Sequence, residues 1–118
     1  MKISLIIPCY KESNRLPLFL NSINQLPGKY PIEIIIVDDG SPTKDFELLK
    51  NKISPLLTNN IRLIHYDANK GKGAAIQHGI ENSVGEYIGF VDADGAIPSH
   101  EVENFIQIKG LIINSQCQ

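Results

Sequence analysis

The sequence has little of what marks several large classes of protein. Its only two cysteines, Cys9 and Cys117, are far apart and stand in no metal-ligand spacing. Such a pair is typical of reduced thiols in a cytoplasmic protein and argues against a disulfide-stapled scaffold. Internal repeats, low-complexity tracts and blocks of like charge are also missing. Their absence excludes repeat architectures and compositionally biased segments.

Long hydrophobic runs are missing too. The longest apolar run near the N-terminus, residues 5–8, is only strand-sized and follows a single Lys2. A transmembrane helix needs about 20 predominantly apolar residues, and a secretory leader also needs a longer apolar stretch. We therefore expect no membrane span in this chain, so that any anchor would lie outside it. The expected location is the cytoplasm, or the cytoplasmic face of a membrane by peripheral association.

A marked excess of one charge is the third missing feature. The 11 basic and 13 acidic residues give a net charge of -2, which offers no strong electrostatic case for nucleic acid or an anionic membrane surface. Hydrophobic residues make up 42% and charged residues 20% of the chain, as in an ordinary globular protein. Because 118 residues suit one core but not two, we expect a single domain over residues 1–118.

What the sequence does contain is an alternation of short apolar runs with amphipathic segments. The apolar runs predict four strands, at residues 3–7, 32–37, 61–66 and 87–91. Apolar residues at helical spacing predict four helices, over residues 15–26, 46–57, 74–84 and from residue 98 onward. Short loops between alternating strands and helices predict a mostly parallel sheet with helices on both faces, a three-layer α/β/α fold.

Local signals predict where several elements end and which way they face. Pro8 lacks an N–H donor, so the first strand is predicted to end before it, and Pro27 with Gly28 is predicted to end the first helix. Helical spacing predicts that the third helix turns Ile76, Ile80 and Val84 inward. The same spacing predicts three inward residues in the last helix, Val102, Phe105 and Ile106.

Unusual residues follow all four predicted strands. In open α/β sheets, ligands bind in the crevice beyond the carboxyl ends of the strands. The segments that occupy these positions are residues 8–12 (PCYKE), 38–41 (DDGS), 69–73 (NKGKG) and 92–95 (DADG). The fold is therefore expected to bring five acidic residues and a Gly-Lys loop to one rim.

The Asp-x-Asp pair at Asp92 and Asp94 is the most informative of these segments. Carboxylates one residue apart at a strand end can both approach one hard cation, and leave coordination positions for diphosphate oxygens and water. Magnesium or manganese suits such oxygen ligands. The alternative is a solvated acidic turn, which the preceding apolar strand and the following Gly95 disfavour.

The other segments carry weaker signals. Backbone N–H groups of the Gly-Lys loop could cradle a phosphate, with Lys72 adding charge. The spacing matches neither the P-loop nor the GxGxxG fingerprint, however, so a plain loop is the favoured interpretation of this segment taken alone. A carboxylate at Asp38 or Asp39 could accept hydrogen bonds from a base or ribose, but Asp-Gly-Ser is also an ordinary turn. Tyr10 could stack on a base or cover the core. The three histidines show no ligand spacing and are interpreted as structural or exposed: His65, His78 and His100.

Taken together, these segments resemble the family 2 glycosyltransferases of the GT-A fold. The matching segments are residues 6–12, 36–41, 69–73 and 91–95, and their order and spacing cover essentially the whole chain. Within the family, the chain looks most like the dolichyl-phosphate glucosyltransferase and polyprenyl-phosphate sugar transferase group. That finer resemblance depends on residues 15–17 (RLP) and 94–96 (DGA). Lys11 departs from the family pattern, which usually has Asn there.

The resemblance implies a nucleotide-sugar-binding domain with roles for individual residues. Three residues after the first strand would line the nucleotide pocket: Pro8, Tyr10 and Glu12. Asp39 would bind the base while Asp38 shapes the turn, and Lys72 would face the nucleotide or its phosphates. In the Asp92-Ala93-Asp94 segment, Asp92 would contact sugar or ribose and Asp94 would hold the metal, Mg²⁺ or Mn²⁺. Asp92 and Asp94 are thus the predicted catalytic and metal-binding residues, and Ala93 lies in the donor site between them.

The implied reaction is metal-dependent transfer of a hexosyl group from a nucleoside diphosphate sugar, with inversion at the anomeric carbon. UDP-glucose is the first choice of donor and GDP-mannose the second, and the acceptor would be polyprenyl phosphate or a glycan. One alternative is a non-catalytic nucleotide-sugar-binding fragment, or an inactive remnant that needs a partner. Another is a phosphatase or phosphotransferase that uses Asp-x-Asp, but those enzymes place the pair after the first strand, where this chain has Pro8-Cys9-Tyr10.

Length is the main departure from the family. Catalytic domains of this kind continue well beyond the donor-binding segments, whereas this sequence ends at Gln118, about where a fifth strand would begin. We therefore expect a truncated domain, either a fragment or a naturally short protein, with an unfinished sheet edge. Such an edge favours self-association, here through the strand at residues 87–91 and the apolar end of the last helix, Leu111, Ile112 and Ile113.

Overall fold

The structure is a computed structural model that describes residues 2–116, with side chains described for residues 2–107. Strands and helices alternate along these residues as the apolar pattern predicts. In chain order the elements are β1 (Ile3–Cys9), α1 (Leu16–Ile23), α2 (Leu26–Lys29), β2 (Ile32–Asp39), α3 (Thr43–Ile53), the 3-10 turn η1 (Ser54–Leu56), β3 (Ile61–Tyr66), α4 (Lys72–Glu81), β4 (Tyr87–Phe90) and α5 (Ser99–Gln116).

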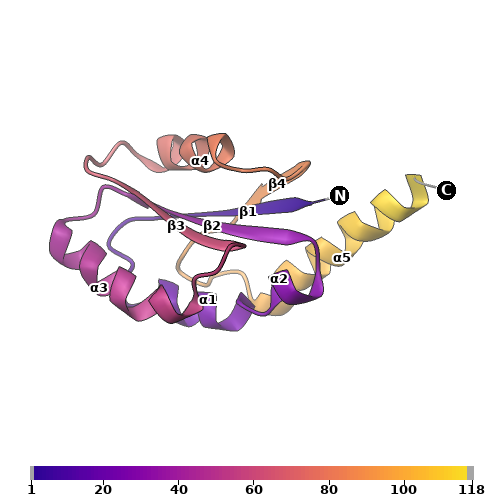
Figure 1. Cartoon of the computed structure of the whole chain (residues 1–118), viewed down its shortest axis with the longest axis horizontal. Helices are drawn as coiled ribbons and strands as arrows, with labels where there is room; N and C mark the ends of the chain where they lie inside the picture. Colours follow the sequence, from indigo (N-terminus) through magenta and orange to yellow (C-terminus); the bar gives the residue numbers. More distant parts are fainter. Residues whose placement is uncertain (1, 117–118) are drawn as a thin grey trace.

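The four strands form one parallel sheet in the order β3-β2-β1-β4. Helix α4 covers one face of this sheet, and α1, α2, α3 and α5 lie on the other (Figure 1). The predicted three-layer α/β/α arrangement is therefore confirmed. Because all strands run in the same direction, their carboxyl ends meet at one edge of the sheet.

The two central strands explain why the sequence contains such apolar runs. Every residue of β1 and of β2 is buried, because helices cover both faces and a strand lies on each side. A strand in this position needs apolar side chains on both faces and not an alternating pattern. Strands β3 and β4 lie at the edges of the sheet and are more exposed.

The main core lies between the sheet and the helices α1, α3 and α5. Alternate residues of the central strands, such as Leu5, Ile7 and Ile34, pack there against Leu20 of α1 and Ile53 of α3. A smaller core lies under α4, made by Ile6, Ile35, Val37 and Ala75. Burial of these apolar side chains fixes the register of the strands, and so fixes which residues lie at the carboxyl edge.

Strand β1 runs through Pro8, whereas the sequence predicted an end before it. The carbonyl oxygen of Ile6 accepts a hydrogen bond from the N–H of Val91 at 3.1 Å, so the backbone groups of Ile6 and Pro8 both point to the β4 side. The pairing of β1 with β4 stops where Ile6 meets Phe90. Because no β4 residue pairs opposite Pro8, its missing N–H costs the sheet no hydrogen bond.

The first helix also differs from its prediction. Helix α1 ends at Ile23, and Pro27 and Gly28 lie inside a separate short helix, α2, instead of stopping the first one. Pro27 stands in the first turn of α2, where a residue without an N–H is tolerated. The proline therefore begins a turn here, and the prediction that it ends a long helix was wrong.

The inward face of α4 was also predicted incorrectly. Ile80 is 38% exposed and Val84 is 69% exposed, while the buried positions are Ala75 and Gly79. A Cβ atom at Gly79 would lie only 2.6 Å from Cγ2 of Ile6, so α4 approaches β1 too closely for a larger residue. Val84 lies after the helix, which ends at Glu81.

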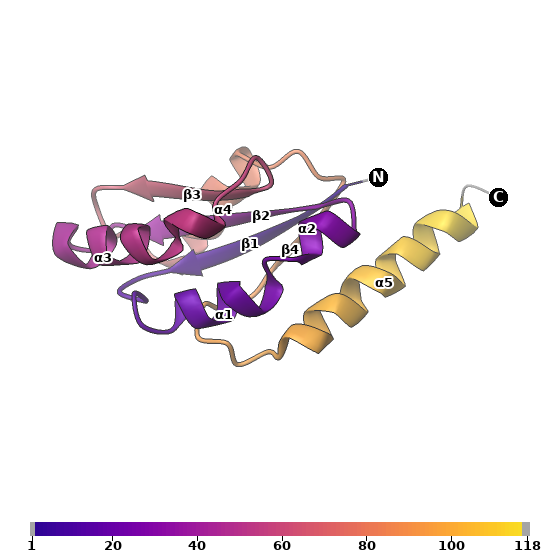
Figure 2. The ribbon, with the colours of Figure 1, turned by 60° about the horizontal axis from the view of Figure 1, so that its bottom comes forward.

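Helix α5 leaves the body of the domain at an angle (Figure 2). Val102 and Ile106 are buried as predicted, but Phe105 is 43% exposed. Glu103 ties α5 to α2, because it accepts hydrogen bonds from Lys29 Nζ at 2.8 Å and from the hydroxyl of Tyr30 at 2.7 Å. The helix continues to Gln116, and the side chains of Leu111, Ile112 and Ile113 lie outside the described residues. Within the described part of the chain, no helix has both the length and the apolar character that a membrane crossing requires.

Candidate functional site

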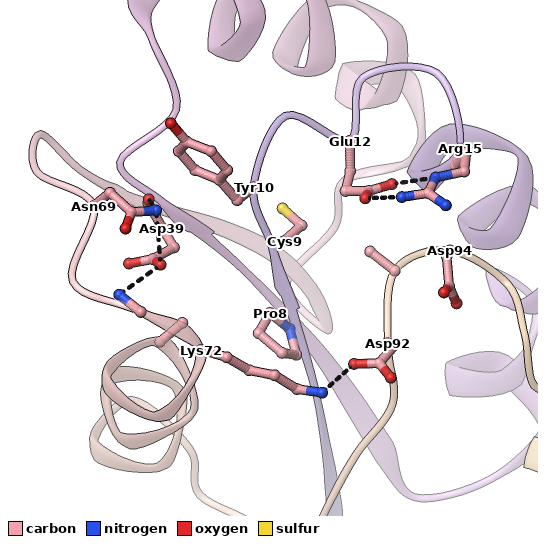
Figure 3. Close-up of a pocket in the computed structure, with 13 residues that line it drawn as sticks. Pro8, Cys9, Tyr10, Glu12, Arg15, Asp39, Asn69, Lys72, Asp92 and Asp94 are labelled. Atoms are coloured by element: carbon pink, nitrogen blue, oxygen red, sulfur yellow. Dashed lines mark hydrogen bonds and ion pairs between the residues drawn. The ribbon is translucent and has the colours of Figure 1, made fainter.

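A pocket of about 350 Å³ lies at the carboxyl edge of the sheet. All four segments singled out in the sequence contribute to it, as Figure 3 shows. The lining residues are Pro8, Cys9, Tyr10, Glu12, Arg15, Asp39, Asn69, Gly71, Lys72, Ala75, Asp92, Ala93 and Asp94. The structure therefore brings together every predicted site residue except Asp38, which is buried and does not line the pocket.

Asp39 is the most fully bonded side chain of the pocket. Its Oδ1 accepts hydrogen bonds from the hydroxyl of Tyr66 at 2.5 Å and from the backbone N–H of Lys70 at 2.9 Å. Its Oδ2 accepts from Asn69 Nδ2 at 3.2 Å and from the N–H of Gly71 at 2.9 Å. Burial and the neighbouring Asp39 carboxylate raise the pKa of Tyr66, so its hydroxyl keeps the proton that it donates. Asp39 thus holds the loop that follows β3.

Asp38 performs a similar task for the loop that follows β1. It is 1% exposed and accepts hydrogen bonds from Ser41 Oγ at 2.7 Å, from the Ser41 N–H at 3.0 Å and from His65 Nδ1 at 2.9 Å. Ser41 Oγ in turn accepts from the N–H of Lys11 at 2.9 Å. Lys11 has a φ of 55°, a left-handed conformation that is uncommon for a residue other than glycine. The Asp38–Ser41 pair therefore supports the turn that presents Tyr10 and Glu12.

Cys9 lines the pocket in surroundings that disfavour its thiolate form. Burial raises the pKa of its thiol, and the negative charge of Asp38 raises it further. A thiol in such surroundings stays protonated, and the thiolate is the reactive form of cysteine. We therefore assign Cys9 a packing role.

Glu12 and Arg15 form an ion pair at the pocket wall. Arg15 Nε donates to Glu12 Oε2 at 2.8 Å, and Arg15 Nη2 donates to Glu12 Oε1. The carboxylate side chain is 13% exposed and the guanidinium side chain 61%, so Arg15 presents positive charge to solvent beside the pocket. The sequence indicated Arg15 only as part of the family resemblance, and its position at the pocket was not predicted. The i,i+3 spacing to Glu12 was the available signal.

Lys72 reaches across the pocket from the first residue of α4 to the segment after β4. Its Nζ lies 2.5 Å from Asp92 Oδ1, and both side chains are about half exposed, at 53% and 54%. An ion pair this open to water contributes only about 0–1 kcal/mol. Either partner can therefore exchange the other for a more strongly charged group, such as a diphosphate or a metal ion.

The segment after β4 alternates between the core and the rim. Ala93 is 3% exposed and packs in the main core, while Asp92 and Asp94 are exposed on either side of it. Asp94 Oδ1 accepts a hydrogen bond from the N–H of Ala96 at 2.9 Å, and Gly95 takes a φ of 74°. The buried alanine therefore anchors the turn and leaves both carboxylates at the pocket.

The described residues contain no group of three His, Cys, Asp or Glu side chains able to hold a metal ion by themselves. Two carboxylates at an open pocket still fit Mg²⁺ or Mn²⁺, because such ions commonly take one or two protein carboxylates and complete their coordination with phosphate oxygens and water. The donor set is therefore suited to a metal that is bound together with a phosphate-bearing ligand.

The three histidines lie where structural roles are expected. The ring of His65 stacks on Phe46 with centroids 3.9 Å apart, in addition to its contact with Asp38. His78 packs at a tilted angle against Tyr66 with centroids 5.0 Å apart. His100 is exposed at the start of α5. None of the three lines the pocket.

Comparison with known proteins assigns the family. A family model described as glycosyl transferase family 2 matches residues 4–108. The chain belongs to glycosyltransferase family 2. This match includes all the segments that line the pocket, as the resemblance in the sequence predicted.

The curated relatives of this glycosyltransferase chain include dolichyl-phosphate beta-glucosyltransferases. It is 38% identical over 117 residues to the enzyme of Dictyostelium discoideum, covering 93% of this chain and 35% of the relative. It is 37% identical over 111 residues to the enzyme of Saccharomyces cerevisiae, covering 88% of this chain and 33% of the relative. The chain thus spans about a third of the length of these relatives.

Solved structures confirm the GT-A fold of this glycosyltransferase chain. It matches residues 1–349 of S. aureus TarS with a TM-score of 0.62 and 23% identity, covering 88% of this chain and 31% of that one. It matches M. tuberculosis glucosyl-3-phosphoglycerate synthase with a TM-score of 0.60 and 21% identity, covering 79% and 34%. A mannosyltransferase from Pyrobaculum calidifontis in complex with GDP-Man and Mn²⁺ matches with a TM-score of 0.56 and 21% identity, covering 78% and 27%.

Proposed function

We propose that residues 1–118 form the donor-binding part of a hexosyltransferase that uses a nucleoside diphosphate sugar. The observation that carries this proposal is the convergence of the segments after all four strands on one pocket of about 350 Å³. That volume lies within the range of small-molecule sites. UDP-glucose is the first choice of donor, because the relatives described above are glucosyltransferases. GDP-mannose is the second, because a structural neighbour binds GDP-Man.

The pocket offers a partner for each part of such a donor. Tyr10 is 39% exposed and provides an aromatic surface for the base. Lys72 can leave Asp92 and pair with the diphosphate, and the freed Asp92 carboxylate can accept hydroxyl groups of the ribose or sugar. The backbone N–H groups at the start of α4 add positive potential to the phosphate side of the pocket.

Asp94, with Asp92 beside it, would hold Mg²⁺ or Mn²⁺. When bound, such an ion neutralises the charge that develops on the departing diphosphate. Asp94 supplies a carboxylate that the turn at Ala96 already orients, and Lys72 adds a second positive charge near the same phosphates. These groups favour bond breaking because they stabilise the leaving group where its charge appears.

The proposed acceptor is polyprenyl phosphate, with a glycan as the second choice, and the proposed outcome is inversion at the anomeric carbon. A phosphate acceptor is already anionic at neutral pH, so it depends less on a general base than a sugar hydroxyl does. The relatives described above are named for dolichyl phosphate, which supports this choice. The reaction would take place in the cytoplasm, at the cytoplasmic face of the membrane that holds the lipid.

A non-catalytic donor-binding module remains the alternative function. It would share the pocket and bind the donor, but it would need a partner chain for transfer. The length of the relatives supports this alternative, because this chain covers only about a third of their sequences. Donor binding is common to both functions, whereas turnover separates them.

Calorimetric titration tests the donor site directly. We expect the chain to bind UDP, UDP-glucose or GDP-mannose in the presence of Mn²⁺, and to lose at least about tenfold in affinity with chelator, the equivalent of ~1.4 kcal/mol. Asp94→Asn is expected to reduce the effect of the metal. Glu47→Gln, an exposed change in α3 away from the pocket, is the matched control. Equal affinities with and without metal would contradict the assignment of Asp94.

A further inference from the structure

A second pocket, of about 450 Å³, lies next to the donor pocket. Helix α1 and the segment between β4 and α5 form it, and its lining residues are Arg15, Leu18, Phe19, Ser22, Asp94, Gly95, Ile97, Pro98 and Ser99. Arg15 and Asp94 line both pockets. Figure 3 shows these two residues at one end of the donor pocket, with Asp39 at the other. The two pockets therefore meet at the end of the donor site where the proposed metal ligand lies.

The walls of the second pocket are apolar and exposed. Leu18 is 76% exposed on α1, and Ile97 is 44% exposed on the segment before α5. Phe19 is 6% exposed, and a Cβ atom at Gly95 would lie 3.9 Å from Phe19 Cβ. The segment and the helix therefore approach each other at Gly95 and Phe19, and they leave Leu18 and Ile97 open to solvent. Exposed apolar side chains gathered at a pocket mark a ligand or partner site.

The end of this pocket that joins the donor site carries a positive charge. Arg15 uses its Nε and Nη2 atoms to bond to Glu12. A guanidinium has five N–H donors, so further donors remain for a second anion. Hydrogen bonding to Glu12 raises the pKa of Arg15, and the negative charge of Asp94 adds to this effect, so the guanidinium stays charged. A ligand in the second pocket would therefore meet a cation at one end and apolar walls beyond it.

We propose that the second pocket is the acceptor site, where Arg15 holds the phosphate of polyprenyl phosphate and Leu18 and Ile97 contact its first isoprene units. This assignment rests on the proposed function, because it places the acceptor of that transfer. Polyprenyl phosphate matches the pocket because it joins a compact anion to a branched hydrocarbon chain. A glycan would instead place hydroxyl groups against walls that offer them no hydrogen bond.

The residues shared by the two pockets place the acceptor where transfer requires it. Asp94 belongs to the diphosphate end of the proposed donor site and also lines the second pocket. A phosphate held at Arg15 would therefore lie beside the reacting end of the donor. One of its oxygens would form the bond to the anomeric carbon as the bond from that carbon to the diphosphate breaks. The bonding electron pair would leave with the nucleoside diphosphate, and Arg15 would keep its proton throughout.

Calorimetric titration with geranyl phosphate tests this assignment, because this soluble prenyl phosphate has the charged head and two isoprene units. The 118-residue chain is titrated in the presence of UDP and Mn²⁺ with geranyl phosphate, with geraniol and with inorganic phosphate. Geraniol lacks the anion, and inorganic phosphate lacks the hydrocarbon. Each of these two is therefore expected to bind at least about tenfold more weakly than geranyl phosphate.

Substitutions separate the apolar wall from the charged end. Ile97→Ser is expected to lower geranyl phosphate affinity roughly tenfold, the effect of about two CH₂ groups lost from apolar contact. Leu48→Ser is the matched control, because Leu48 is also 44% exposed but lies on α3 and lines neither pocket. Arg15→Gln is expected to weaken geranyl phosphate roughly tenfold while geraniol affinity stays the same. Arg15→Lys keeps the positive charge and is expected to lose less affinity.

Urea unfolding of each variant shows whether it is folded under the titration conditions. Should Ile97→Ser unfold, Leu18→Ser makes the same comparison from the opposite element of the pocket. Leu18 is 76% exposed, so its replacement removes little packing from the folded chain, and geranyl phosphate affinity is expected to fall in the same direction.

The acceptor assignment is wrong if geranyl phosphate fails to bind while UDP binds, or if geraniol binds as tightly as geranyl phosphate. It is also wrong if Ile97→Ser and Leu48→Ser have the same effect. If Ile97→Ser abolishes self-association in light scattering and leaves geranyl phosphate affinity unchanged, a second copy of the chain occupies the pocket instead. All these results leave the donor site standing, whereas failure of UDP itself to bind with metal present overturns the proposed function.

Discussion

Substitution of Gly40 by alanine is expected to damage both the stability and the donor pocket of this glycosyltransferase chain. Gly40 lies in the turn after β2 with a φ of 68°, in the left-handed region that a residue with a Cβ avoids. A Cβ atom there would lie 2.3 Å from the carbonyl carbon of Ala68 and 2.3 Å from the nitrogen of Asn69. Both are backbone atoms, so they cannot rotate away as a side chain could.

The expected loss follows from these two effects. The left-handed conformation costs roughly 1–2 kcal/mol for a residue with a Cβ, and forcing an extra carbon into packed surroundings typically costs about 1–3 kcal/mol. We therefore expect Gly40→Ala to lower the free energy of unfolding by roughly 2–5 kcal/mol, a large share of the ~5–15 kcal/mol that stabilises a typical domain. The backbone of Ala68 and Asn69 must also shift, so UDP affinity is expected to fall in the molecules that remain folded.

Urea denaturation at pH 7 measures the loss, with far-UV circular dichroism as the signal. Gly28→Ala is the matched control, because no atom lies within 4 Å of its Cβ position and its φ is not left-handed. That control is expected to be neutral or to stabilise the fold by about 0.4–1 kcal/mol. A loss of less than about 1 kcal/mol for Gly40→Ala would refute the reasoning from backbone contact.

The remaining predictions concern pH, turnover and assembly. Burial alone would raise the pKa of Glu33, but hydrogen bonds from Ser4, the Val84 N–H and Arg62 outweigh it and hold the pKa below its usual value of 4.5. The stabilising contribution of the Glu33 carboxylate is therefore present above pH 4.5 and is lost as pH falls below it. In urea titrations from pH 7 to 3, Glu33→Gln is expected to flatten the dependence of stability on pH in this range. An unchanged pH dependence would contradict the role assigned to Glu33. The isolated chain is expected to give no repeated transfer of radiolabelled glucose to polyprenyl phosphate, and multiple turnovers would prove this wrong. The chain is also expected to form dimers or larger assemblies through its C-terminal third, because β4 is an edge strand on which Ile88 is 44% and Phe90 55% exposed. Light scattering after size-exclusion chromatography at several concentrations measures the assembly state. A monomer at every concentration would contradict this prediction.

The parallel sheet and the membership of the pocket could be predicted because they depend on strong local patterns. The run from Ile32 to Val37 is apolar apart from Glu33, and only a strand covered on both faces needs such a run. Once the strands are known to be parallel, the segments after them must share one edge. Eight of the nine predicted site residues line the pocket for this reason.

Other features were out of reach because they depend on contacts between distant segments. The close approach of α4 to Ile6 makes Gly79 a buried position, and no helical pattern identifies a glycine as an inward residue. The hydrogen bonds that Asp39 accepts come from the Tyr66 hydroxyl and from the loop that follows Tyr66. The sequence identified the carboxylate but could not show which donors surround it.

The order of the strands has a consequence for how the domain folds. Strand β1 is made first but lies inside the sheet, where Ile3 pairs with Ile32 of β2 and with Tyr87 of β4. Pairing between the first and the last strand closes a long loop, and contacts of this kind slow folding. Until β4 docks, β1 has an open edge and Asp92 and Asp94 are absent from the pocket. A ligand that contacts both Tyr10 and Asp94 therefore binds only chains in which this final step is complete. Such binding would shift the folding equilibrium toward the complete fold.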